Sequence, residues 1–150
     1  MTRDEIMKLE AGRELDALIA EKVMGNDPLI SWAIYNKDKT AYYDVLERRQ
    51  DASDQLAKSR SLRDHGATVD MLKTYKPYST DIADAWQVVE YLEKRDILID
   101  IVRISDRDSL YWLVRLRLIG YNTAYVARAE TAPLAICKAA LMVVTMEETK

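Results

Sequence analysis

The chain has 150 residues, of which 49% are hydrophobic and 31% charged, a composition typical of a soluble globular protein with its own apolar core. Its formal net charge of −3 comes from interspersed acids and bases, which gives no strong signal for nucleic acid or anionic lipid. The single cysteine, Cys137, excludes an internal disulfide, and no apolar run approaches the ~20 residues of a membrane span. Because the N-terminus lacks the apolar segment of a signal peptide, we expect a cytoplasmic protein with no membrane partner.

The N-terminal segment carries two helix signals. Thr2 and Glu5 have the spacing of a capping box, in which each side chain satisfies the other residue's backbone amide. Apolar residues then recur at helical spacing: Leu15, Leu18, Ile19 and Val23. We predict a helix over residues 11–24 that ends at Gly25.

Residues 26–75 carry acidic and basic residues in equal number, and apolar positions are sparse from Ala41 to Arg63. The composition of Ile30–Tyr35 favours a short strand. From Ala41 to Arg63 no glycine or proline interrupts the chain, and we predict a helix that needs a surface to dock on. We interpret residues 26–75 as a helical insertion in a single domain, 1–150, whose core comprises residues 1–25 and 76–150.

The region after Lys76 predicts a compact αβββα unit. Asp81 or a neighbouring hydroxyl residue can cap a helix, and its predicted buried face comprises Ile82, Ala85, Trp86, Val89 and Leu92, with Trp86 as a core anchor. Three β-rich segments follow, at residues 97–104, 110–118 and 123–129. Their short connections predict an antiparallel meander.

The last predicted helix begins at Thr131 and Pro133 and is apolar nearly all round between Leu134 and Met146. A helix of this kind is either enclosed within its own chain or placed at a subunit interface. On this basis we predict a homo-oligomer.

Three stretches resemble the signature blocks of the phage ABA sandwich family, small proteins of phages and prophages with a more distant likeness to NinX-type phage proteins. They are AGRELDALIAEKVMG at residues 11–25, KPYSTDIADAWQVVE at 76–90 and ARAETAPLAICKAAL at 127–141. The resemblance implies an α+β fold arranged as a three-layer α/β/α sandwich, and a place in the cytoplasm of an infected bacterium. It brings no assigned activity and no known catalytic residues, and it does not extend to the insertion.

A candidate ligand site combines two helix N-termini with arginines on neighbouring strands. Helix N-termini and guanidinium groups bind phosphate, and an aromatic ring can stack on a base. The candidate residues are Lys76, Tyr78, Ser79, Thr80, Arg103, Arg115, Arg117, Arg128 and Thr131. The alternative is that the caps only satisfy backbone amides and that the arginines form a solvated strand face.

Signals for catalysis are weak. His65 is the only histidine, and the chain has neither a phosphate-binding glycine loop nor a serine-centred elbow. Asp106 and Asp108 fall in a predicted turn, where short acidic residues are common for backbone reasons. We therefore expect no cofactor and no metal, and a metal-dependent nucleotide hydrolase is a minor alternative.

Two functional hypotheses follow from these observations. The first is a non-enzymatic phage protein that captures a small nucleotide-derived ligand, such as a cyclic ADP-ribose or a cyclic dinucleotide, and so withdraws a host immune signal. The second is an adaptor or inhibitor that acts on a host or phage enzyme through residues 26–75, where Tyr42 and Tyr43 lie.

Overall fold

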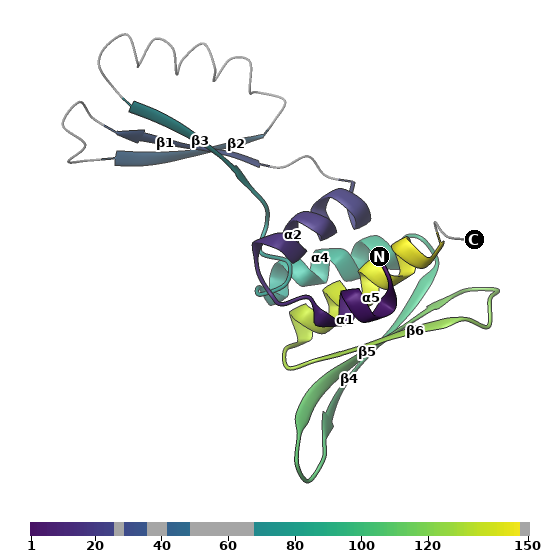
Figure 1. Ribbon diagram of the computed structural model, residues 1–150. Coiled ribbons are helices and arrows are strands. Elements are labelled where there is room, and N and C mark those ends of the chain that lie inside the picture. Colours follow the sequence, from purple (N-terminus) through teal and green to yellow (C-terminus); the bar gives the residue numbers. More distant parts are fainter. Residues whose placement is uncertain (26–28, 36–41, 49–67, 148–150) are drawn as a thin grey trace. The chain divides into compact units, whose positions relative to one another are not determined.

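The computed structural model describes residues 1–25, 29–35, 42–48 and 68–147 (Figure 1). The chain divides into two compact units: unit 1 comprises residues 1–25 and 76–150, and unit 2 comprises residues 26–75. These bounds coincide with those that the sequence predicts for the core and the insertion.

The described residues of unit 2 form three antiparallel strands in the order β2-β1-β3: β1 (Leu29–Tyr35), β2 (Tyr42–Arg48) and β3 (Thr68–Thr74). The predicted strand at Ile30–Tyr35 is confirmed, whereas the helix predicted from Ala41 is wrong over β2. Aromatic and β-branched residues such as Tyr43 and Val45 suit a strand. The backbone of β2 also pairs with β1, an interaction between distant residues that helix propensity does not take into account. The rest of that predicted helix, and His65, lie outside the described residues.

The N-terminal helices begin as their sequence predicts. α1 (Arg3–Lys8) has a complete capping box: the Glu5 amide donates to Thr2 Oγ1 at 3.3 Å, and the Thr2 amide donates to Glu5 Oε2 at 2.7 Å. α2 (Arg13–Leu18) continues as a π-helical turn, η1 (Ile19–Val23). Gly25 follows at a φ of 62°, a left-handed conformation that suits a helix C-terminus.

Helix α4 (Ile82–Glu93) is capped by Asp81, whose Oδ1 accepts from the amides of Ala83 at 2.8 Å and Asp84 at 3.1 Å. Its buried residues are Ala85, Val88, Val89 and Leu92. The predicted face was wrong at two positions, because Trp86 is 49% exposed and Ile82 is 54% exposed. The predicted and the observed buried faces share Ala85, Val89 and Leu92. Packing against the rest of unit 1 buries Val88 in place of Trp86.

The predicted meander is confirmed as a sheet of β4 (Ile97–Ser105), β5 (Leu110–Leu118) and β6 (Ala124–Ala129) in that order. A tight turn joins the first two strands. There the Asp106 amide donates to the Ser109 carbonyl at 2.8 Å, and the Arg107 amide donates to Asp106 Oδ1 at 2.7 Å.

Helix α5 (Ala132–Glu147) is the centre of unit 1, since it contacts β5, β6, α4, η1 and α1. Every residue from Ala135 to Val143 is buried. Enclosure within its own chain therefore explains its apolar sequence. The apolar surface of this helix no longer supports the prediction of a homo-oligomer. Cys137 is buried and free, as expected, and burial raises the pKa of its thiol. Among the described residues, no helix is long and apolar enough to cross a membrane.

These elements confirm the predicted α+β class. In unit 1 the helices lie on one side of the β4-β5-β6 sheet (Figure 1). We call this side the inner face and the opposite side the outer face. The second helical layer that an α/β/α order requires is not among the described elements of unit 1.

Candidate functional site

The outer face consists of every second residue of the three strands, because successive side chains alternate across a sheet. On the central strand, Val114 and Leu116 are buried on the inner face, which places their sequence neighbours on the outer face. Residues paired in register share a face. The outer-face residues are Leu98, Asp100, Val102 and Ile104 of β4, Tyr111, Leu113, Arg115 and Arg117 of β5, and Ala124, Val126 and Arg128 of β6.

Three of the predicted arginines meet on this face. Arg117 Nη2 lies 3.3 Å from Asp100 Oδ2 in an ion pair whose side chains are about half exposed. Arg115 lies between Asp100 and Val126 in register, and the Arg128 guanidinium lies over the Tyr111 ring, 5.4 Å from its centroid. Three arginines against one aspartate give the outer face a charge of +2, opposite in sign to the chain's −3.

An apolar block lies beside these arginines. Leu98 is 49% exposed and Val102 is 47% exposed. Leu113 is the register partner of Val102, and it is half-buried, as are Ile104 and Val126. Val102, Leu113 and Ile104 are neighbours in register, whereas the row of Asp100 and Arg115 separates Leu98 from them.

Arg103 does not belong to this group, and its predicted place beside the other arginines is wrong. It is paired in register with Trp112, and its guanidinium lies 5.8 Å from the centroid of that ring. Trp112 has the same parity as Val114, so both members of this pair lie on the inner side of the sheet, near the end of the β4-β5 hairpin.

The middle of the segment before α4 is buried and is hydrogen-bonded to the start of α2, so it does not form an open phosphate site. Tyr78 and Ser79 are fully buried. The Ser79 amide donates to Asp16 Oδ1 at 2.8 Å, and the Gly12 amide donates to Ser79 Oγ at 2.9 Å. These bonds connect the start of α2 to the start of α4. Both residues are therefore closed to a ligand in this structure, and the amide and hydroxyl of Ser79 serve internal contacts.

The remaining candidates are exposed, but their contacts are local. Lys76 Nζ donates to Gln87 Oε1 at 3.0 Å, and the Thr80 hydroxyl donates to the Pro77 carbonyl at 3.5 Å. The Thr131 carbonyl accepts from the Ala135 amide at 3.1 Å, at the start of α5. The structure does not bring these residues onto the outer face with the arginines.

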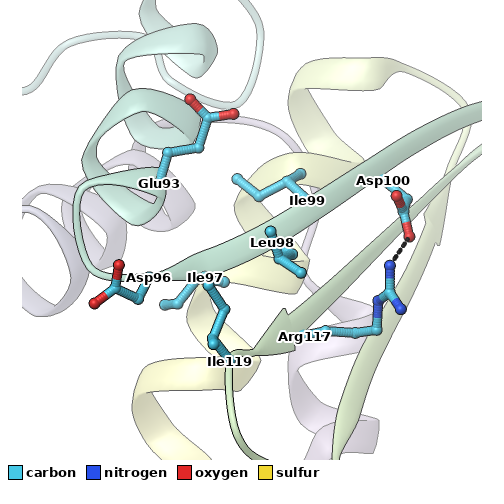
Figure 2. Close-up of a pocket in the computed structure, with 8 residues that line it drawn as sticks. All are labelled: Glu93, Asp96, Ile97, Leu98, Ile99, Asp100, Arg117 and Ile119. Atoms are coloured by element: carbon cyan, nitrogen blue, oxygen red, sulfur yellow. Dashed lines mark hydrogen bonds and ion pairs between the residues drawn. The ribbon is translucent and has the colours of Figure 1, made fainter.

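A pocket of about 320 Å³ borders β4 (Figure 2). Its lining residues are Glu93, Asp96, Ile97, Leu98, Ile99, Asp100, Arg117 and Ile119. Three of these are carboxylates, and Figure 2 shows the one arginine already paired with Asp100. Such a lining repels a phosphate. Within the part of the chain that the structure describes, no three histidine, cysteine or acidic residues are placed to hold a metal.

Sequence reasoning did not identify the apolar part of the outer face. The sequence of β4, ILIDIVRIS, is apolar at both parities, so its alternation does not show which side is covered. The register with β5 supplies that information, because Arg115 and Arg117 mark the outer parity of the neighbouring strand.

Comparison with known proteins gives one match. The family model described as "Phage ABA sandwich domain" matches residues 17–141. Neither the curated proteins nor the solved structures gave a match.

Proposed function

Since this chain belongs to the phage ABA sandwich domain family, we propose that it is a phage-encoded adaptor that binds a host or phage protein through its outer face. One observation carries the proposal: exposed aliphatic side chains and three arginines share one side of a sheet whose other side is covered by helices.

The composition of this face suits a protein partner. Protein interfaces combine an apolar centre with arginine and tyrosine, and residues of these types supply most of the binding energy at interfaces. Val102 and Leu113 provide the apolar centre, and Arg115 and Arg128 flank it. The proposal moves the adaptor surface from residues 26–75, where the sequence predicts it, to the sheet of unit 1. A role for residues 26–75 stays a prediction.

A second candidate is capture of a small nucleotide-derived ligand as a counter-defence, with a cyclic ADP-ribose or cyclic dinucleotide as the class. Arg115, Arg117 and Arg128 offer guanidinium groups to phosphate beside the ring of Tyr111, which favours this candidate. The pocket that Arg117 lines argues against ligand capture. Small ligands are usually enclosed in concave sites, and the carboxylates of this pocket would repel a phosphate.

The adaptor proposal is tested with a charge reversal at the centre of the face. Tagged wild-type protein is expressed in infected cells, the co-purified partner is prepared separately, and its affinity is measured by titration calorimetry. We expect Arg115→Glu to weaken binding about tenfold or more.

Arg95→Glu is the matched control, since Arg95 is exposed, lies after α4 and stacks on Tyr91 at 4.3 Å. It reverses the same charge outside the outer face and should leave the affinity unchanged. Equal affinity for wild type and Arg115→Glu would refute the adaptor proposal.

The second candidate is tested with the same three proteins. They are titrated with cyclic ADP-ribose, cyclic dinucleotides and mononucleotides. Binding that disappears in Arg115→Glu and persists in Arg95→Glu would favour ligand capture, and flat traces for all compounds would reject it.

A further inference from the structure

The outer face has the dimensions of one α-helix. Three strands spaced about 4.8 Å apart place the outer two about 10 Å from each other, close to the 10–12 Å diameter of a helix with side chains. The strands β4 and β5 each have 9 residues, so they extend about 30 Å, the length of a helix of about 20 residues.

The inner face of the same sheet shows which residues the sheet uses to pack against a helix. α5 contacts β5 and β6, and both contribute buried apolar residues: Val114 and Leu116 from the sheet, and Ile136 and Val143 from α5. The outer face repeats the apolar positions with Val102 and Leu113 but adds guanidinium groups. A helix on the outer face therefore needs an apolar stripe with charged flanks, unlike α5.

The charge of the flanks follows from the arginines. Arg115 lies one register row from the Val102–Leu113 pair, and Arg128 lies in the same row on β6. Arg117 is already paired with Asp100, so Arg115 and Arg128 are the guanidinium groups that would meet acidic side chains in the flanks of such a helix.

Other occupants fit less well. A second copy would place one face of charge +2 against another, a repulsion that an acidic partner avoids. Single-stranded nucleic acid is bound on several exposed aromatic rings, whereas the strands of the outer face carry one, Tyr111, and Arg128 already covers it.

We infer that the outer face binds a single amphipathic helix with glutamate or aspartate flanks, supplied by a partner protein as the second helical layer on this sheet. This inference rests on the proposed adaptor function and specifies the element of the partner that is recognised.

The test uses a displayed library of 20-residue peptides. Leucine is fixed at i, i+3, i+4 and i+7 spacing, and the flanking positions carry Glu, Gln or Lys at random. The library is selected in parallel on wild type, Arg115→Glu and Arg95→Glu. We expect glutamate enrichment on wild type and Arg95→Glu, and its loss or replacement by lysine on Arg115→Glu.

The most enriched peptide is then synthesised with a fluorescent label. Its affinity, measured by anisotropy, should fall at least tenfold with Arg115→Glu, and circular dichroism should show helix formation on binding. Urea unfolding confirms that each variant is folded, and Arg128→Glu replaces Arg115→Glu if the latter is not.

Several outcomes would overturn the inference. They are no enrichment, lysine enrichment on wild type, equal selection on Arg115→Glu, tighter binding of an oligothymidylate, or an Arg115-dependent dimer in light scattering. If no peptide binds while a purified partner protein still binds in an Arg115-dependent way, the inference that the outer face recognises a helix is wrong, and the adaptor proposal stands. If the partner's binding does not depend on Arg115, the adaptor proposal fails as well.

Discussion

The two faces of the β4-β5-β6 sheet are made by the same strands, but the centre of the inner face is buried and uncharged while the outer face carries exposed arginines. Val114 and Leu116 on the inner face are buried under helices, whereas Arg115 and Arg117, their immediate neighbours, are exposed. The inner face therefore carries stability, and the outer face can change its chemistry at little cost to folding. This division is the physical basis for assigning binding to the outer face.

The largest expected difference between the faces comes from one substitution made on each. Leu116→Ala on the inner face should lower the free energy of unfolding by about 2–5 kcal/mol, because it leaves a cavity in the core. Leu98→Ala on the outer face should lower it by less than about 1 kcal/mol, since Leu98 is 49% exposed. Urea unfolding measures both values, and similar losses would show that the outer face is covered.

The covered side should also show itself in the pH dependence of stability. Burial, with a smaller contribution from Asp16, raises the pKa of the Cys137 thiol above its ordinary value of 9.0. The unfolded chain ionises above about pH 9 while the folded chain keeps its proton, so Cys137 lowers stability as pH rises, by up to about 1.4 kcal/mol per pH unit.

The neighbouring Lys138 acts in the opposite direction. Burial lowers its pKa from 10.5, partly offset by Glu10, so its contribution to stability rises with pH between its lowered folded value and 10.5. Cys137→Ala keeps Lys138, and the difference between wild type and this variant isolates the thiol. Parallel stability curves from pH 8 to about 10.5 would contradict the burial of Cys137.

A smaller effect is expected at Trp86, on the solvent side of the helical layer. A core tryptophan replaced by alanine costs about 3–5 kcal/mol, but Trp86 is 49% exposed, and we expect about 1 kcal/mol. Val88→Ala, a smaller truncation at a fully buried position of the same helix, should cost as much or more. Chemical denaturation of both variants checks the order, and a loss near 4 kcal/mol at Trp86 would restore it as a core anchor.

The smallest effect concerns the ion pair on the outer face. Arg117→Ala should change the free energy of unfolding by at most about 0.5 kcal/mol, because its pair with Asp100 is half exposed and screened by solvent. Stability measured at low and at high salt should hardly differ between wild type and variant. A loss above about 2 kcal/mol would mean that the pair is buried by something on this face.

Local signals in the sequence predicted much of unit 1. The Thr2–Glu5 spacing and Asp81 define helix starts through hydrogen bonds that span two or three residues, so no distant partner is needed to recognise them. The alternation in β5 is also a local pattern, since Arg115 and Arg117 fall at one parity of the strand and Val114 and Leu116 at the other. Each of these features depends on neighbours within a few residues along the chain.

The candidate site was less predictable because it depends on register and packing. The sequence does not show that Arg103 pairs with Trp112, nor that Ser79 meets Asp16 from a helix 63 residues away. The helical periodicity of α4 predicted Trp86 in the buried face, and only the position of the neighbouring elements places Val88 there instead. In β2, pairing with β1 outweighed an uninterrupted run without helix breakers.

By itself, the sequence determined the order of elements in unit 1, the caps of its helices and the alternation of β5, because backbone hydrogen bonding and side-chain periodicity are local. Tertiary structure alone decided which arginines share a face, which side of β4 is covered and that α5 is enclosed by its own chain. Those outcomes follow from strand register and from helices burying apolar area, which join residues far apart in the chain.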